Sequence, residues 1–177
     1  MANKFQLPVS GTTSDGLAVT ITEAEVNYLT QVAGWEKFEQ AASDALRRYE
    51  LVLPQDCREA FRKDSVIVWR IAPDRALVRS GSPIKFDDDE QLAALELSDS
   101  RVCVQVNGPG AVSFLSRVVA LDLSEKCFSV GSFAQTAIHH INVLLDRSEV
   151  DEFNVLLPTT FSVSLTDYLL EHFNVVP

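Results

Sequence analysis

A strand pattern runs directly into a helix pattern at residues 101–121, and this junction restricts the folds that the chain can adopt. In "RVCVQV", residues 101–106, valine alternates with other residues, as in a strand with one buried face. The glycine-rich stretch "NGPG" follows, and its Pro109 suits a first helical turn. The next apolar residues share one helical face: Ala111, Phe114, Leu115 and Val118. We therefore predict a strand that enters a helix through a glycine turn.

Two more strands and a helix complete this C-terminal half. After an irregular stretch at 122–132, the run "AQTAIHHINVLL" at 134–145 predicts one long strand. "EFNVLLP" at 152–158 predicts a second strand. "TTFSVSLTDYLLEHF" at 159–173 predicts a helix that Thr159 or Thr160 can cap.

The N-terminal half has a similar order of elements. Strand patterns occupy 17–21 and 26–33, and 65–71 and 75–80 predict a hairpin joined by "APD". The helix pattern at 34–50 directs one face to the core: Trp35, Phe38, Ala42, Ala45, Leu46 and Tyr49. In "DDDEQLAALEL", residues 87–97, four acids suit the N-terminal end of a short helix, whereas the D-x-D-x-D-G spacing of a calcium loop is absent.

The two halves thus share the plan strand, helix, strand, strand, helix, offset by about 74 positions. This plan predicts an α+β fold of two ferredoxin-like halves packed as one body. We expect residues 1–16 to form an irregular lead-in. Residues 17–177 then form a single domain with halves at about 17–97 and 98–177.

Composition narrows the classes of function. The 177 residues include 25 acidic and 15 basic ones, a net charge of −10, with no segregated basic patch, so nucleic-acid binding is not expected. No apolar run approaches the roughly 18 residues of a membrane span, so we expect no membrane contact. Cys57, Cys103 and Cys127 are widely separated and form no C-x-x-C pair, so we expect reduced thiols in a cytoplasmic protein.

His139 and His140 are two of the three histidines in the chain. Neighbouring residues on a strand point to opposite faces of the sheet, so these two are not expected to bind one ion together. We expect one imidazole to pack near the core and the other to face solvent or a partner. A metal site that uses the histidines is a further hypothesis.

Other residues favour structural roles. "NGPG" is interpreted as a turn, with anion binding at the helix start as the alternative. Asp99 and Asp122 are interpreted as turn or cap residues and not as general bases. Trp35, Trp69 and Cys103 are expected in the core. Nucleotide-binding, hydrolase and metalloprotease motifs are missing, so we predict no catalytic, cofactor-binding or metal-binding residue.

Short motifs occur in a characteristic order and spacing over about 80 residues: Leu97-Ser98-Asp99, Ser100-Arg101-Val102, Gly108-Pro109, Asp122-Leu123, 128–131, Ala134-Gln135-Thr136, Val143-Leu144-Leu145, and Phe153 before Leu157-Pro158. In these motifs the sequence resembles the gamma subunit of heterotetrameric sarcosine oxidase and the related small subunit of N-methylglutamate dehydrogenase. "GWEKFEQAAS" and "IAPDRALVRSG" resemble the same family more loosely.

The resemblance implies a shortened form of the folate-binding domain of aminomethyltransferases. It implies a complex with alpha, beta and delta subunits that oxidises an N-methyl amino acid such as sarcosine. FAD, FMN, NAD and tetrahydrofolate are then expected on the partner subunits, and this chain is expected to be a non-catalytic subunit.

The alternative is a free-standing folate-binding protein of the aminomethyltransferase type. Such a protein should have a pocket with convergent polar groups around Asp99, Arg101 and Gln135.

Overall fold

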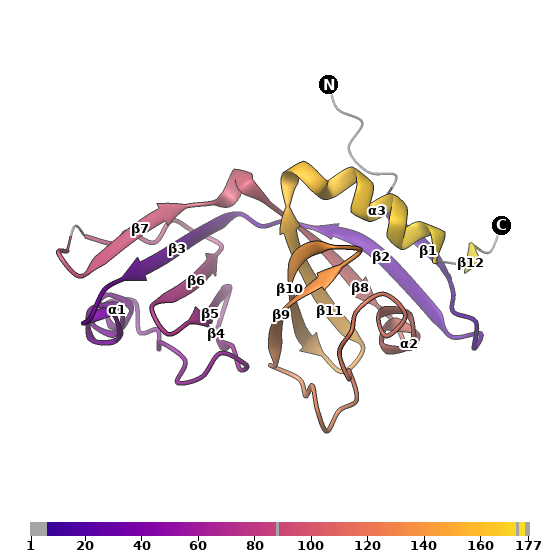
Figure 1. Cartoon of the computed structure of the whole chain (residues 1–177), viewed down its shortest axis with the longest axis horizontal. Coiled ribbons are helices and arrows are strands. Elements are labelled where there is room, and N and C mark those ends of the chain that lie inside the picture. The colour runs from indigo at the N-terminus through magenta and orange to yellow at the C-terminus, as the bar shows by residue number, and fades with distance from the viewer. Residues whose placement is uncertain (1–6, 88, 173, 176–177) are drawn as a thin grey trace. The chain divides into compact units, whose positions relative to one another are not determined.

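The computed structural model describes residues 7–87, 89–172 and 174–175. The chain forms two compact units, one of residues 1–25 with 100–177 and one of residues 26–99 (Figure 1). No helix in the described ranges is long and apolar enough to span a bilayer.

The larger unit is built on a seven-stranded antiparallel sheet with the order β12-β1-β2-β8-β11-β10-β9. Two α-helices and a short 3-10 helix, η2, connect its strands. Its elements are β1 (Val9–Thr12), β2 (Ala18–Ala24), β8 (Arg101–Asn107), α2 (Ala111–Leu115), β9 (Phe133–Ile138), β10 (Ile141–Glu149), β11 (Glu152–Pro158), η2 (Thr159–Phe161), α3 (Ser162–Glu171) and β12 (Asn174–Val175).

One core joins α2, α3 and a face of this sheet. Phe114 and Leu115 of α2 and Leu165 and Leu169 of α3 are buried in the same apolar cluster. The sheet contributes alternate residues of its strands, as the period of two requires: Val19, Ile21, Val104, Val106, Val143, Leu145, Phe153, Val155 and Leu157. Burial of each large side chain contributes about 1.5–3 kcal/mol, so this cluster is the main stabilising feature of the unit.

The glycine turn between β8 and α2 depends on close approach to β2. Gly108 has φ +122°, and a Cβ at this position would lie 2.7 Å from the carbonyl oxygen of Ala18. The N–H of Gly110 donates to that same oxygen at 2.9 Å. The predicted strand, turn and helix are confirmed, because glycine lets the chain reverse against β2.

The smaller unit is built on a five-stranded antiparallel sheet with the order β4-β5-β6-β3-β7. The amphipathic helix α1 packs on it through Phe38, Ala42 and Leu46. The elements of this unit are β3 (Tyr28–Gly34), α1 (Phe38–Arg47), β4 (Phe61–Lys63), β5 (Val66–Ala72), β6 (Arg75–Ser80), β7 (Leu92–Glu96) and most of the 3-10 helix η1 (Ser98–Ser100). The predicted hairpin is confirmed as the β5–β6 pair.

Each unit contains one buried arginine that holds irregular segments in place. In the larger unit, Arg147 donates to the carbonyl oxygens of Phe128 and Val150 at 2.6 Å each and of Leu123 at 3.3 Å. In the smaller unit, Arg70 donates to the carbonyl oxygens of Pro54, Gln55 and Pro73 at 3.1–3.3 Å. Each guanidinium thus satisfies several backbone acceptors, and the hydrogen bonds to Pro54, Leu123 and Phe128 are buried.

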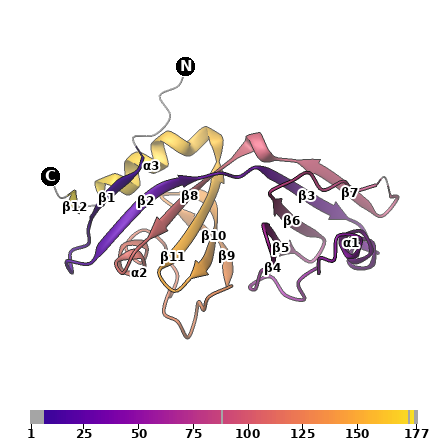
Figure 2. The ribbon, with the colours of Figure 1, turned by 180° about the vertical axis from the view of Figure 1, so that it is seen from behind.

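The two units share a strand order, as Figure 2 shows from behind. In the larger unit β11 lies between β8 and β10, and in the smaller unit β6 lies between β3 and β5. A helix follows the first strand in both cases. The α+β class is therefore confirmed. The predicted plan of strand, helix, strand, strand, helix differs from the structure, because three strands follow the helix in each unit and β7 takes the place of the last helix in the smaller unit.

Several predicted elements differ from the structure. A helix was expected at 87–97, but Leu92–Glu96 form the strand β7, because pairing with β3 overrides the helix propensity of "LAAL". Residues 134–145 form two strands instead of one. The expected irregular lead-in contains β1. The strand β2, which was expected in the half 17–97, pairs with β8 and belongs to the unit that holds residues 100–177.

Two smaller predictions are also wrong. Trp35 lies outside the core with 61% of its surface exposed, and Tyr49 is 39% exposed, because α1 begins only at Phe38 and ends at Arg47. Thr159 and Thr160 do not cap α3, since they belong to η2 and Phe161 occupies the N-cap without a side-chain bond. Trp69 and Cys103, by contrast, are fully buried as predicted.

Candidate functional site

His139 and His140 form a two-residue hairpin turn between β9 and β10. Ile138 pairs with Ile141, and the histidines have φ angles of 45° and 68°. Two consecutive positive φ values are the mark of a type I′ turn, which usually contains Asn-Gly or Asp-Gly. Both histidines are exposed. The prediction of opposite faces of one strand is therefore wrong, and neither imidazole is buried.

The third histidine lies in the same cluster of rings. The His139 ring stacks on the Tyr168 ring of α3, with 4.3 Å between centroids and 23° between planes. The Tyr168 ring meets the His172 ring at 4.4 Å. His172 is held by a contact of 2.8 Å between its Nδ1 and the carbonyl oxygen of Tyr168. His139 and His172 thus lie on either side of Tyr168, and the ring of His140 lies 5.5 Å from that of His139.

This histidine–tyrosine cluster consists of stacked rings with Tyr168 in the middle. Tyr168 separates His139 from His172, which does not favour one ion bound by both. Within the described residues, no group of three or more His, Cys, Asp or Glu is arranged to hold a metal ion. Ring stacking contributes about 0.5–1.5 kcal/mol per pair, so the cluster fastens the β9–β10 turn to α3.

Tyr168 was not singled out by the sequence, because 134–145 was interpreted as one strand. The apolar residues on both sides of the histidine pair are compatible with a hairpin. The usual turn residues are missing, however, and histidine at positive φ is less common than glycine or asparagine.

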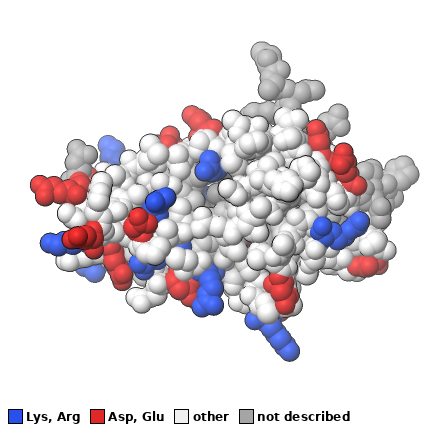
Figure 3. Space-filling model, in the orientation of Figure 1, with Lys and Arg blue, Asp and Glu red and all other residues white. Residues whose placement is uncertain are grey.

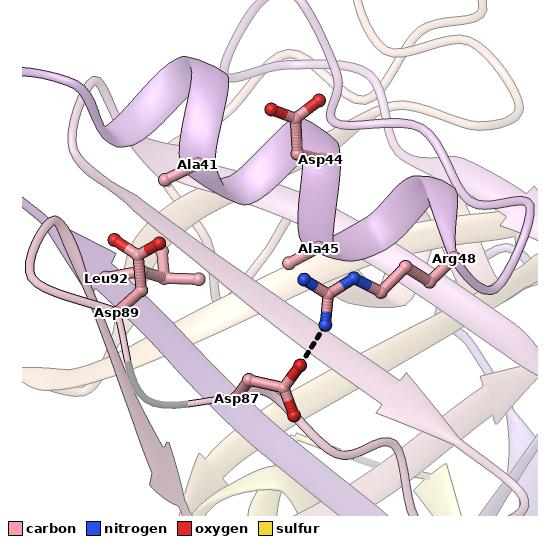
Figure 4. A pocket seen from close by; sticks show the side chains of 7 residues that line it. All are labelled: Ala41, Asp44, Ala45, Arg48, Asp87, Asp89 and Leu92. Atoms are coloured by element: carbon pink, nitrogen blue, oxygen red, sulfur yellow. Dashed lines mark hydrogen bonds and ion pairs between the residues drawn. The ribbon is translucent and has the colours of Figure 1, made fainter.

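A cavity of about 230 Å³ lies between α1 and the start of β7 (Figure 4). Arg48 points toward Asp87 and forms an ion pair with it. The cavity is lined by Ala41, Asp44, Ala45, Arg48, Asp87, Asp89 and Leu92. Its volume falls below the roughly 300 Å³ of small-molecule pockets, and its ion pair is exposed. We assign it no catalytic role.

A second hollow of about 250 Å³ lies beside the β5–β6 hairpin. It is lined by Asn27, Asp64, Ser65, Ile67, Arg79, Ser80 and Gly81. Its lining does not include any of the residues that the sequence singled out.

Asp122 acts as a turn residue, as predicted. Its Oδ1 accepts the N–H of Ser124 at 2.9 Å. That backbone hydrogen bond, with further ones from the side chains of Ser124 and Cys127, lowers the pKa of the Asp122 carboxyl below its ordinary value. A carboxyl held in its ionised form in this way is a poor proton acceptor near neutral pH.

The polar residues proposed for a folate pocket do not converge. Arg101 begins β8 and Gln135 lies on β9, and β11 and β10 separate these strands in the sheet. Three strand spacings place them about 14 Å apart. Asp99 is exposed in the 3-10 turn η1. The predicted pocket of convergent polar groups is therefore wrong.

The "NGPG" segment is a turn, and the helix that follows has only five residues. Acidic and basic side chains are interspersed on the face that Figure 3 shows, without an area of basic side chains alone. Cys57 and Cys127 are exposed and Cys103 is buried, and all three are free thiols.

Comparison with solved structures assigns the fold. The chain matches a chain of heterotetrameric sarcosine oxidase from Corynebacterium sp. U-96, a complex with pyrrole 2-carboxylate, with a TM-score of 0.80 and 23% identity. The match covers 93% of this chain and 86% of that one. The chain has the fold of a sarcosine oxidase chain.

The same fold recurs in a larger protein. Glycine cleavage system aminomethyltransferase T from Bartonella henselae matches with a TM-score of 0.60 and 18% identity, over 85% of this chain and 45% of that chain. This chain therefore spans less than half of that transferase. No family model and no curated protein matches the sequence. The aminomethyltransferase-like fold implied by the short motifs is confirmed.

Proposed function

We propose that this chain is the gamma subunit of a flavin-dependent complex of the sarcosine oxidase type, which oxidatively demethylates an N-methyl amino acid. The extent of the structural match carries the proposal, because this chain and the sarcosine oxidase chain correspond over most of both lengths. The chain then has an assembly role in a cytoplasmic complex.

In this proposal the alpha, beta and delta subunits bind FAD, FMN, NAD and tetrahydrofolate and perform the chemistry. The contacts of the histidines and buried arginines of this chain are compatible with catalysis by the partner subunits. Its histidines His139 and His172 are used in ring contacts with Tyr168, and its buried arginines Arg70 and Arg147 bind backbone carbonyl oxygens.

Co-expression tests the proposal. The chain is produced together with the alpha, beta and delta subunits of sarcosine oxidase from the same organism, and the mixture is separated by size-exclusion chromatography. We expect the chain to elute with the larger subunits, whereas the chain expressed alone elutes at its own size. A chain that never co-elutes with them would sink the proposal.

A free-standing folate-binding protein is the second candidate, favoured by the likeness to aminomethyltransferase T. The separation of Arg101 from Gln135 weighs against it, as does the much greater length of the transferase. Calorimetry of the isolated chain with tetrahydrofolate separates the two candidates. Absence of binding heat at millimolar ligand removes this second candidate.

A further inference from the structure

The outer edge of β7 is an exposed strand in the smaller unit. Four consecutive residues, 93–96, are exposed, and Leu95 keeps 57% of its surface accessible. Among the strands of the described ranges, only β3 pairs with β7. Proteins usually protect such edges with charges, prolines or bulges, but "LAAL" has none of these at 92–95.

The hydrogen-bonding register shows which backbone groups face outward. Leu97 donates to the carbonyl oxygen of Leu29, and Gln91 accepts from the N–H of Trp35. In an antiparallel pair the bonded positions alternate, so odd-numbered residues of β7 bond to β3. The N–H and C=O groups of Ala94 and Glu96 therefore point away from β3, where another strand can bond to them.

An exposed tryptophan lies beside the start of β7, on the side of β3. Trp35 directly follows β3, and its backbone bond to Gln91 places it beside the start of β7. It is the most exposed large apolar side chain of the described residues, at 61%. Tryptophan is enriched among the residues that carry most of the binding energy in protein interfaces.

Carboxylates lie at both ends of β7. Asp89 and Glu90 precede the strand, Glu96 ends it, and all three are exposed. This arrangement favours a partner segment with basic side chains at matching positions, because opposite charges guide docking and set register.

From these observations we infer that β7 is a docking edge, at which an extended basic segment of a larger subunit adds as a strand and contacts Trp35 and Leu95. This inference rests on the proposed function. Strand addition supplies main-chain hydrogen bonds, and alternate side chains of the added segment provide specificity. Leu95 and Ala93 share one face with Gln31 and Ala33 of β3, so the added strand would extend that face.

Two variants test this docking edge. Ala94→Pro removes an outward N–H and leaves the bonds to β3 in place, since proline is tolerated on edge strands. Leu95→Lys adds a charge to the exposed face. Val52→Lys is the matched control, because Val52 is 55% exposed in the same unit but lies outside the strands. Circular dichroism and the thermal midpoint of each free chain report folding.

The readout is recovery of the chain with a tagged alpha subunit after co-expression of the complex. We expect recovery of Ala94→Pro and Leu95→Lys to fall at least tenfold, and recovery of Val52→Lys to equal that of the wild type. Equal recovery of folded Leu95→Lys and wild type would overturn the docking edge and leave the subunit role intact. No recovery of the wild type would overturn the subunit role, and the docking edge with it.

Discussion

The ring of His139 lies on the ring of Tyr168, with 4.3 Å between their centroids. This contact joins a hairpin turn to α3, two segments that are far apart in the sequence. It accompanies a backbone that is unfavourable for histidine, since both turn residues have positive φ. The stack and the turn therefore have opposite effects on stability.

Glycine substitution separates these effects. His140→Gly removes the cost of about 1–2 kcal/mol that a histidine has in the left-handed backbone conformation. The greater conformational freedom of glycine in the unfolded chain offsets about 0.4–1 kcal/mol of this gain in stability. His139→Gly has the same backbone gain in stability, but it also removes the stack on Tyr168, which contributes about 0.5–1.5 kcal/mol. We expect His140→Gly to be the more stable variant by about 1 kcal/mol in urea unfolding. Equal stabilities would show that the stack contributes nothing.

We expect any side chain at position 108 to destabilise the fold. Gly108→Ala adds a Cβ that lies 2.7 Å from the carbonyl oxygen of Ala18, at a φ of +122°. Gly131→Ala is the matched control, because Gly131 also has positive φ, +89°, but has open space around it. The control should lose about 1 kcal/mol of unfolding free energy and Gly108→Ala clearly more. Similar losses in both variants would contradict the close approach to β2.

Arg147 is expected to hold residues 122–132 in place. Arg147→Met leaves the buried carbonyl oxygens of Leu123 and Phe128 without this donor, so we expect a loss of about 3 kcal/mol. Arg117→Met changes an exposed arginine and should stay within about 0.5 kcal/mol of the wild type. Hydrogen exchange should also become faster across 122–132 in Arg147→Met alone. Unchanged exchange there would exclude this role.

The hydrogen bonds of the Asp122 carboxylate make the free energy of unfolding depend on pH in the acidic range. Folding lowers the pKa of Asp122 below its ordinary value of 3.8, mainly through the backbone N–H of Ser124. Its contribution is therefore complete above that ordinary value and is lost as pH falls through the lower folded pKa. In Asp122→Asn this contribution is absent, so the two proteins should differ at pH 7 and converge in acid. A difference that grows as pH falls would reverse the sign and contradict the assignment.

The sequence predicted those helices and strands whose pattern of apolar residues depends on neighbouring residues in the chain. Alternation in 101–106 and helical spacing in 111–118 reflect one buried face; the strand is present, and the helix is present over Ala111–Leu115. The β5–β6 hairpin also carries its own turn signal. The aminomethyltransferase-like fold followed from short motifs at characteristic spacing.

Features that depend on contacts between residues distant in the sequence could not be predicted from the sequence. The residues "LAAL" favour a helix by propensity, and only pairing with β3 makes them a strand. The His139-His140 turn lacks the usual turn residues, so the contact with Tyr168 could not be anticipated. Trp35 has the helical spacing of a core residue but lies before the first residue of α1.

The mass of the intact complex tests the subunit role most directly. The complex is purified through a tag on the alpha subunit after co-expression with this chain, and native mass spectrometry measures its composition. We predict a species that contains the alpha, beta and delta subunits together with one copy of this 19.6 kDa chain. A complex of the other three subunits that lacks the chain would contradict the account.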